Sequence, residues 1–148
     1  MAPLITLIAG FAVARIVGLA GFDALDSTTD ALRVGLAAMF VLTGLAHFGE
    51  PRRSGLIAMV PPRLPRPALL VTVTGVLELV GAAALLVPAT ARWGAAGLGL
   101  LMLAMFPANV SAAQRRLTLG GRPVTPLGQR TALQIAFLVT AAVISFGA

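Results

Sequence analysis

Long apolar stretches separated by short polar segments run through the whole chain. Five can be recognised, over residues of about 4–22, 31–48, 68–88, 93–113 and 131–147. Each comes close to the roughly 20 apolar residues that a helix needs to cross the hydrocarbon core of a bilayer. The pattern therefore predicts one all-α integral membrane domain, residues 1–148, built as a bundle of five transmembrane helices.

Composition agrees with this assignment and narrows the chemistry. Hydrophobic residues make up 58% of the chain and charged residues 11%, whereas soluble domains average about 45–50% and about 25%. The chain has no cysteine and a single histidine, which excludes disulfides, Cys/His catalytic clusters and a metal site of such ligands. No nucleotide loop or nucleophile triad is present. The chain alone thus carries no catalytic constellation, which argues against an enzyme without excluding one.

The basic residues predict how the bundle is oriented. All eleven are arginines, and the net charge is +6. Apart from Arg15 and Arg33, they lie between the apolar stretches, where membrane orientation explains them better than nucleic-acid binding does. Because the loops after the second and fourth stretches are the basic ones, the positive-inside rule predicts a cytoplasmic N-terminus and an outer C-terminus in the plasma (inner) membrane. The cytoplasmic arginines of this prediction are Arg52, Arg53, Arg63, Arg66, Arg115, Arg116, Arg122 and Arg130.

The third apolar stretch carries an acidic residue, Glu78, at its centre. An ionised carboxylate at the middle of a membrane helix costs roughly 2.5–3.5 kcal/mol, so Glu78 must be protonated, paired or turned towards protein. At 1.5 Å per residue, Glu78 lies about 15 Å from the cytoplasmic end of its helix and Arg15 about 16 Å from that of the first. We therefore predict an Arg15–Glu78 ion pair. Either the pair is structural, or the carboxylate binds a proton or a ligand.

A second polar layer is expected near the cytoplasmic side. His47 ends the second stretch, Asn109 lies about one turn from the end of the fourth, and Gln134 about one turn into the fifth. These three residues are expected to meet in a small polar pocket beneath Pro107, which should kink or break its helix and free a carbonyl. With Glu78 they form the candidate ligand-binding set. The alternative is that His47 bonds a helix end and the two amides only bridge helices.

Five segments, in this order, resemble the DoxX-like family of small integral membrane proteins. They are MFVLTGLAHF (39–48), MVPPRLPRP (59–67), TGVLELVGAAALLVP (74–88), AMFPANVSAA (104–113) and R-x-x-L-Q (130–134). The resemblance implies a four-helix core that holds His47, Glu78, Asn109 and Gln134, to which this chain adds an extra N-terminal helix. It also implies a place in a respiratory or thiol redox system, with a quinone as a ligand. Without a cysteine, a thiol version of that role needs a partner.

Three functions are therefore open. The first is a DoxX-like inner-membrane protein, a non-catalytic or quinone-associated subunit of a redox or oxidative-stress system with a cytoplasmic or membrane oxidoreductase as partner. The second is a small proton-coupled transporter that uses Glu78 and, at this length, works as a homo-oligomer. The third is a ligand-free membrane scaffold. All three share the lipid bilayer as a partner, and none involves nucleic acid.

Overall fold

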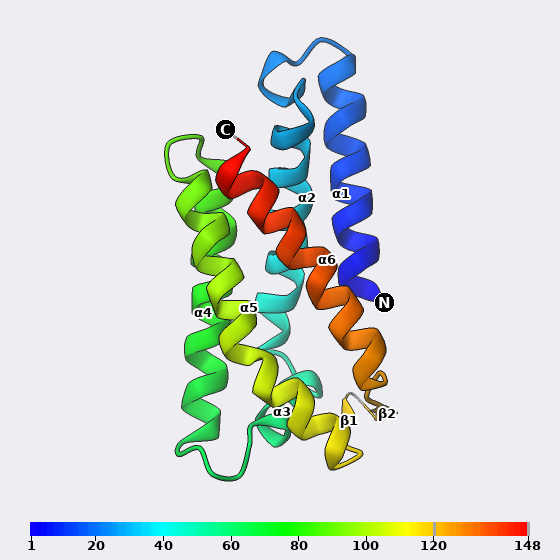
Figure 1. Cartoon of the computed structure of the whole chain (residues 1–148), viewed down its shortest axis with the longest axis vertical. Helices are drawn as coiled ribbons and strands as arrows, with labels where there is room; N and C mark the ends of the chain where they lie inside the picture. The colour runs from blue at the N-terminus through cyan, green and yellow to red at the C-terminus, as the bar shows by residue number, and fades with distance from the viewer. Residues whose placement is uncertain (120, 148) are drawn as a thin grey trace.

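The computed structural model describes residues 1–119 and 121–147 of the chain. Its helices are α1 (Ala2–Leu19), α2 (Thr28–Ala46), α3 (Arg52–Met59), α4 (Pro67–Leu86), α5 (Ala91–Gln114) and α6 (Leu127–Phe146). A 3-10 turn, η1 (Asp23–Leu25), follows α1, and a small hairpin of β1 (Thr118–Leu119) and β2 (Arg122–Pro123) precedes α6 (Figure 1). Five helices, all except α3, are long and apolar enough to cross a membrane. The predicted number of membrane-length helices is thus confirmed.

Local sequence signals explain where the helices begin. The Ser27 hydroxyl accepts a hydrogen bond from the Asp30 backbone N–H, so α2 begins at Thr28, earlier than predicted. Pro67 stands in the first turn of α4, where a backbone N–H is not needed, and residues 60–66 before it form no helix. Helix α5 continues through Pro107. A break at that proline, one of the two predicted outcomes, is therefore not present.

The helices form a bundle with α1 at its edge (Figure 1). Helix α2 packs against α4 and α6, α5 packs against both α4 and α6, and α1 packs along α2. A glycine permits the close approach of α1, since a Cβ on Gly35 would lie 2.6 Å from the Leu7 carbonyl oxygen. In Figure 1 the N-terminus lies about halfway along the long axis, and the α1–α2 loop extends beyond the α4–α5 loop. Helix α1 is thus shifted lengthwise relative to the rest of the bundle.

Buried apolar side chains from several helices form the core. The largest fully buried ones are Leu36, Met39, Leu85, Leu98 and Ile144. Many other leucine, isoleucine and valine side chains are exposed on the outer faces of the long helices. Such faces suit a hydrocarbon surrounding, in which the outside of a bundle is as apolar as its inside.

The two ends of the bundle differ in charge. Helix α3, the hairpin and the adjoining ends of α2, α4, α5 and α6 gather at one end in Figure 1. The segments at this end, which we call the basic end, carry the eight arginines named above. The opposite end has the α1–α2 loop with Asp23 and Asp26, followed by Asp30 in the first turn of α2. The basic loops thus lie on one side of the bundle, as the alternation along the sequence requires.

Candidate functional site

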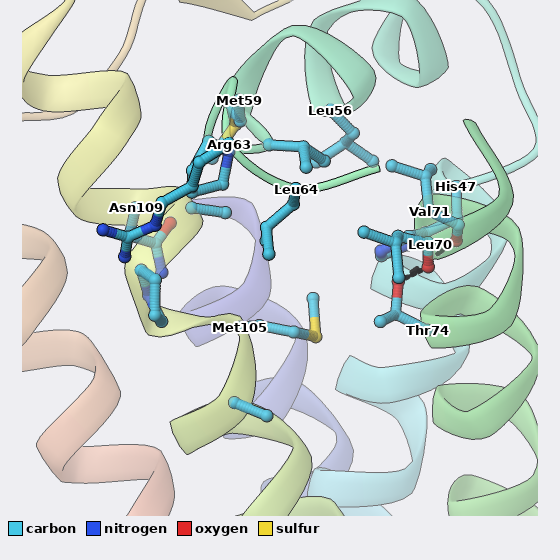
Figure 2. A pocket seen from close by; sticks show the side chains of 15 residues that line it. His47, Leu56, Met59, Arg63, Leu64, Leu70, Val71, Thr74, Met105 and Asn109 are labelled. Atoms are coloured by element: carbon cyan, nitrogen blue, oxygen red, sulfur yellow. Dashed lines mark hydrogen bonds between the residues drawn. The ribbon is translucent and has the colours of Figure 1, made fainter. Parts of the chain in front are cut away.

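A cavity of about 490 Å³ opens at the basic end, beneath α3 and the proline-rich segment 60–66. This volume lies within the range of about 300–1,000 Å³ that is usual for small-molecule sites. Most of the lining is apolar, and the polar side chains in it are His47, Arg63, Thr74 and Asn109. Figure 2 shows His47 and Thr74 on one side of the cavity and Arg63 and Asn109 on the other, with Met105 between them. An apolar chamber with polar groups at two facing walls suits a small amphiphilic molecule.

His47 is held in a defined orientation at the cavity wall. The residue follows the last residue of α2 and is only 4% exposed. Its Nδ1 lies 2.8 Å from the Thr43 carbonyl oxygen. Since a carbonyl only accepts hydrogen bonds, Nδ1 carries a hydrogen and donates it. The other ring nitrogen, Nε2, lies 4.0 Å from Oε1 of Glu78.

Glu78 lies behind His47, within the packing of α4 on α2. It is 4% exposed and does not line the cavity. Its Oε2 accepts a hydrogen bond of 2.5 Å from the Thr43 hydroxyl. Among the described residues, the acid–base pairs within ion-pair distance are Arg33 with Asp30 and His47 with Glu78, and the histidine is charged only when it is protonated. The immediate polar partners of Glu78 are thus a threonine and a histidine, both from the α2 end.

The predicted Arg15–Glu78 ion pair is not the arrangement in the structure. Arg15 instead donates from Nη1 to the backbone carbonyl of Asp26, in the loop that follows α1. The prediction placed the two residues at one depth by assuming that both helices start at the same level. Figure 1 shows that α1 starts about halfway along the bundle. The bond of Arg15 to Asp26 accordingly places it next to the acidic α1–α2 loop instead.

The structure separates the two amides that were expected in one pocket. Asn109 lines the cavity, and its Oδ1 accepts a hydrogen bond from Nη1 of Arg130. That bond leaves the side-chain NH2 of Asn109 as the group that can donate to a ligand. Gln134 is not part of the cavity lining, and its Nε2 donates to the Met102 carbonyl over 3.0 Å. The structure thus brings His47, Asn109 and Pro107 together around one cavity, with Glu78 adjacent and Gln134 apart.

Two arginines at the basic end hold α3 and segment 60–66, which cover the cavity, against the neighbouring helices. Arg53 donates from Nη1 to the His47 carbonyl over 2.7 Å, and from Nη2 to the Thr72 hydroxyl over 3.0 Å. Arg115 donates from Nη2 to the carbonyls of Ala58 and Val60, at the end of α3. Charged donors near helix ends satisfy carbonyls that have no partner within the helix. In the sequence these two residues look like the other loop arginines, for which the charge pattern predicts only a part in membrane orientation.

Thr43 is the part of the site that sequence reasoning missed. It touches both Glu78 and His47, through its hydroxyl and its carbonyl respectively. The available signal was its spacing from His47, because residues four apart share one face of a helix. Threonine is common in apolar helices, however, and this spacing alone does not indicate a site.

The partners of Glu78 can be tested with double-mutant cycles. We expect Thr43→Val and Glu78→Leu to be coupled by about 1 kcal/mol, since each change removes one side of the same hydrogen bond. Arg15→Leu and Glu78→Leu should be additive to within about 0.5 kcal/mol, because these residues share no partner. The measurement is the free energy of unfolding in detergent micelles. A larger coupling energy with Glu78 for Arg15 than for Thr43 would show that Glu78 pairs with Arg15 after all.

A family model described as "Domain of unknown function (DUF8561)" matches residues 36–145. The match runs from within α2 into α6, so that it includes every residue of the cavity lining and leaves α1 outside. No curated protein and no solved structure matches the chain. Because the family model covers well over half of the sequence, the protein belongs to the DUF8561 family.

Proposed function

We propose that this protein binds a small amphiphilic molecule in the cavity at its basic end, and that the ligand is a membrane quinone. The observation that carries the proposal is the largely apolar cavity of about 490 Å³, with His47 on one wall and Asn109 and Arg63 on the facing wall (Figure 2). A quinone has a flat apolar ring with a carbonyl oxygen at each of two opposite positions. Hydrogen-bonding side chains on two facing walls match that arrangement, and the apolar lining suits the ring and its tail.

The polar groups of the cavity suit both the oxidised form (quinone) and the reduced form (hydroquinone) of such a ligand. The NH2 group of Asn109 and the guanidinium of Arg63 donate hydrogen bonds to a carbonyl oxygen. The Nε2 atom of His47 faces Glu78 across 4.0 Å, and a small rotation of the imidazole turns it towards the ligand. There it accepts a hydrogen bond from a hydroquinone hydroxyl when the imidazole is neutral, and donates to a quinone carbonyl when it is protonated. In this role the protein binds and presents the ligand without catalysis, as a quinone-associated subunit that works with an oxidoreductase. The resemblance to the DoxX-like family favours the same assignment.

The proposed location is the plasma (inner) membrane, with the basic end in the cytoplasm. Eight arginines on the segments at one end, against an acidic loop at the other, support this orientation under the positive-inside rule. The cavity then lies near the cytoplasmic surface. Six of these arginines are exposed, of which Arg115 bonds the end of α3 and Arg63 lines the cavity. The other four, which are available to anionic lipids or to a partner protein, are Arg52, Arg66, Arg116 and Arg122.

The ligand proposal is tested by thermal unfolding of the detergent-purified protein with short-tailed ubiquinone and menaquinone analogues. A ligand that binds only the folded state raises the melting temperature. We expect a quinone to do so for wild type and for Ala96→Phe, which adds a ring to an exposed position of α5. In Ala108→Phe the ring enters the cavity, and the affinity should fall at least about tenfold, equivalent to about 1.4 kcal/mol. No shift with any quinone, or an equal shift in both variants, would contradict the proposal.

A second function, proton-coupled transport, is favoured by one observation. Glu78 is buried, and no arginine of the described residues bonds to it, so that its carboxyl group is free to bind a proton or a cation. Organic cations in the same assay would then stabilise wild type but not Glu78→Gln, and the protein in liposomes would couple their uptake to proton movement. If no compound of either class shifts the melting temperature, the ligand-free scaffold becomes the best assignment.

A further inference from the structure

Thr43, His47 and Glu78 form a single polar cluster where α2 meets α4. The side chains of His47 and Glu78 are each only 5% exposed. Thr43 forms a hydrogen bond with each of them. Its hydroxyl donates to Oε2 of Glu78, and its carbonyl accepts from Nδ1 of His47. The two remaining atoms, Oε1 and Nε2, face each other across 4.0 Å. The cluster therefore points a carboxyl oxygen at an imidazole nitrogen.

The charged groups around this cluster have other partners. From α3, Arg53 bonds the backbone carbonyl of His47 rather than its ring. From α6, Arg130 bonds Asn109 of α5 and the Thr125 carbonyl, and Arg33 of α2 bonds Asp30 and the Leu85 carbonyl. In α1, Arg15 bonds the Asp26 carbonyl.

Arg63, from segment 60–66, lies on the far wall of the cavity (Figure 2). With a neutral His47, an ionised Glu78 would thus be a buried charge that no cation among the described residues compensates. Such a charge is strongly disfavoured inside a protein within a bilayer.

We propose that Glu78 and His47 together bind one exchangeable proton, and that this proton enters and leaves through the cavity that His47 lines. In one state the pair is a carboxylic acid and a neutral imidazole. In the other, the proton has moved from Oε1 to Nε2, and the pair is a carboxylate and an imidazolium. The net charge of the pair is zero in both states, which removes the uncompensated charge. Since 4.0 Å is longer than a hydrogen bond, the transfer needs a small rotation of the imidazole or one bridging water.

The proton site adjoins the cavity of the proposed function and adds a proton to what that site binds. The link between the two rests on the proposed function, in which the cavity is open to a ligand. A hydrogen-bond acceptor placed against His47 favours the imidazolium state, and a donor favours the neutral imidazole. The cavity then takes ligands that exist in both acceptor and donor forms, and the position of the proton follows the form that is bound. The proton site itself does not depend on the identity of that ligand.

Infrared difference spectroscopy on the protein in liposomes, without any ligand, tests the proposal. We expect a carbonyl band of a protonated carboxylic acid that is absent in Glu78→Gln, shifts in D2O and disappears as the pH is raised. His47→Asn keeps a side-chain N–H towards the Thr43 carbonyl and removes the second ring nitrogen. Because coupled groups interact by more than about one pK unit, the midpoint of the titration should move by about one pH unit or more in this variant.

The route of the proton is tested with the two phenylalanine variants described above, Ala108→Phe and Ala96→Phe. Hydrogen–deuterium exchange of the band should be slowed in Ala108→Phe, where the ring fills the cavity, and unchanged in Ala96→Phe. The proposal is overturned if no band depends on Glu78 at any pH, or if His47→Asn leaves the titration unchanged. It is also overturned if hydrogen–deuterium exchange of the band is equally fast in the two phenylalanine variants. Since no quinone is present, the quinone assay can fail while this band still titrates, and the reverse also holds.

Discussion

Gly75→Leu is expected to lower the free energy of unfolding by about 3 kcal/mol or more, the upper end of the range for an overpacked core. Helix α4 approaches the end of α2 so closely here that a Cβ on Gly75 would lie 2.5 Å from Cβ of His47 and 3.0 Å from the ring of Phe48. A leucine side chain must therefore push the two helices apart. The same displacement moves His47 away from the cavity wall, so we also expect the quinone-induced rise in melting temperature to be lost.

The matched control is Gly97→Leu. Gly97 lies in α5, is exposed, and a Cβ there would meet no atom within 4 Å. This change should alter the free energy of unfolding by no more than about 0.5 kcal/mol, or stabilise the helix slightly. Both variants are compared by denaturant unfolding in micelles. Equal stability of Gly75→Leu and wild type would mean that α2 and α4 do not approach each other this closely.

Arg53→Ala is expected to lower the free energy of unfolding by about 2 kcal/mol, within the range for lost hydrogen bonds to a charged group. The guanidinium of Arg53 joins the carbonyl of His47, at the end of α2, to Thr72 in the first turns of α4. Without it, the carbonyl of a buried residue loses its donor. Since that bond also holds His47 in place, ligand affinity should fall as well. Arg53→Lys should be intermediate, because an ammonium group cannot span both partners as a guanidinium does.

The neighbouring arginine provides the control for this prediction. Arg52 is exposed, and within the described part of the chain its side chain makes no hydrogen bond or ion pair. Arg52→Ala removes the same charge from the same loop, so both variants change the electrostatics of the basic end alike. We expect this change to alter the stability by no more than about 0.5 kcal/mol. If both alanine variants lose the same stability, the contribution of Arg53 is its charge and not its contacts.

Arg52 and Arg53 also show which features of the protein can be predicted from the sequence and which cannot. The sequence identifies both as loop residues at the basic end, and nothing in it distinguishes the one that bonds a helix end from the one that is exposed. The same holds for Glu78. The cost of its charge predicted a polar partner, but the partner assigned from helix depth was Arg15. Counting residues gives a position along one helix, whereas the lengthwise offset between α1 and α4 depends on how their surfaces pack.

The sequence by itself determined the five membrane-length helices, the separation of charge between the loops, and the candidate set of His47, Glu78, Asn109 and Gln134. These follow from hydrophobicity and charge, which act locally along the chain. Only the tertiary structure decided that His47 and Asn109 face one cavity, that Gln134 bonds the Met102 carbonyl, and that Thr43 joins Glu78 to His47. These contacts depend on the offset and rotation of each helix, which are set by close approach at glycines such as Gly35 and Gly75 and by packing between residues far apart in the chain.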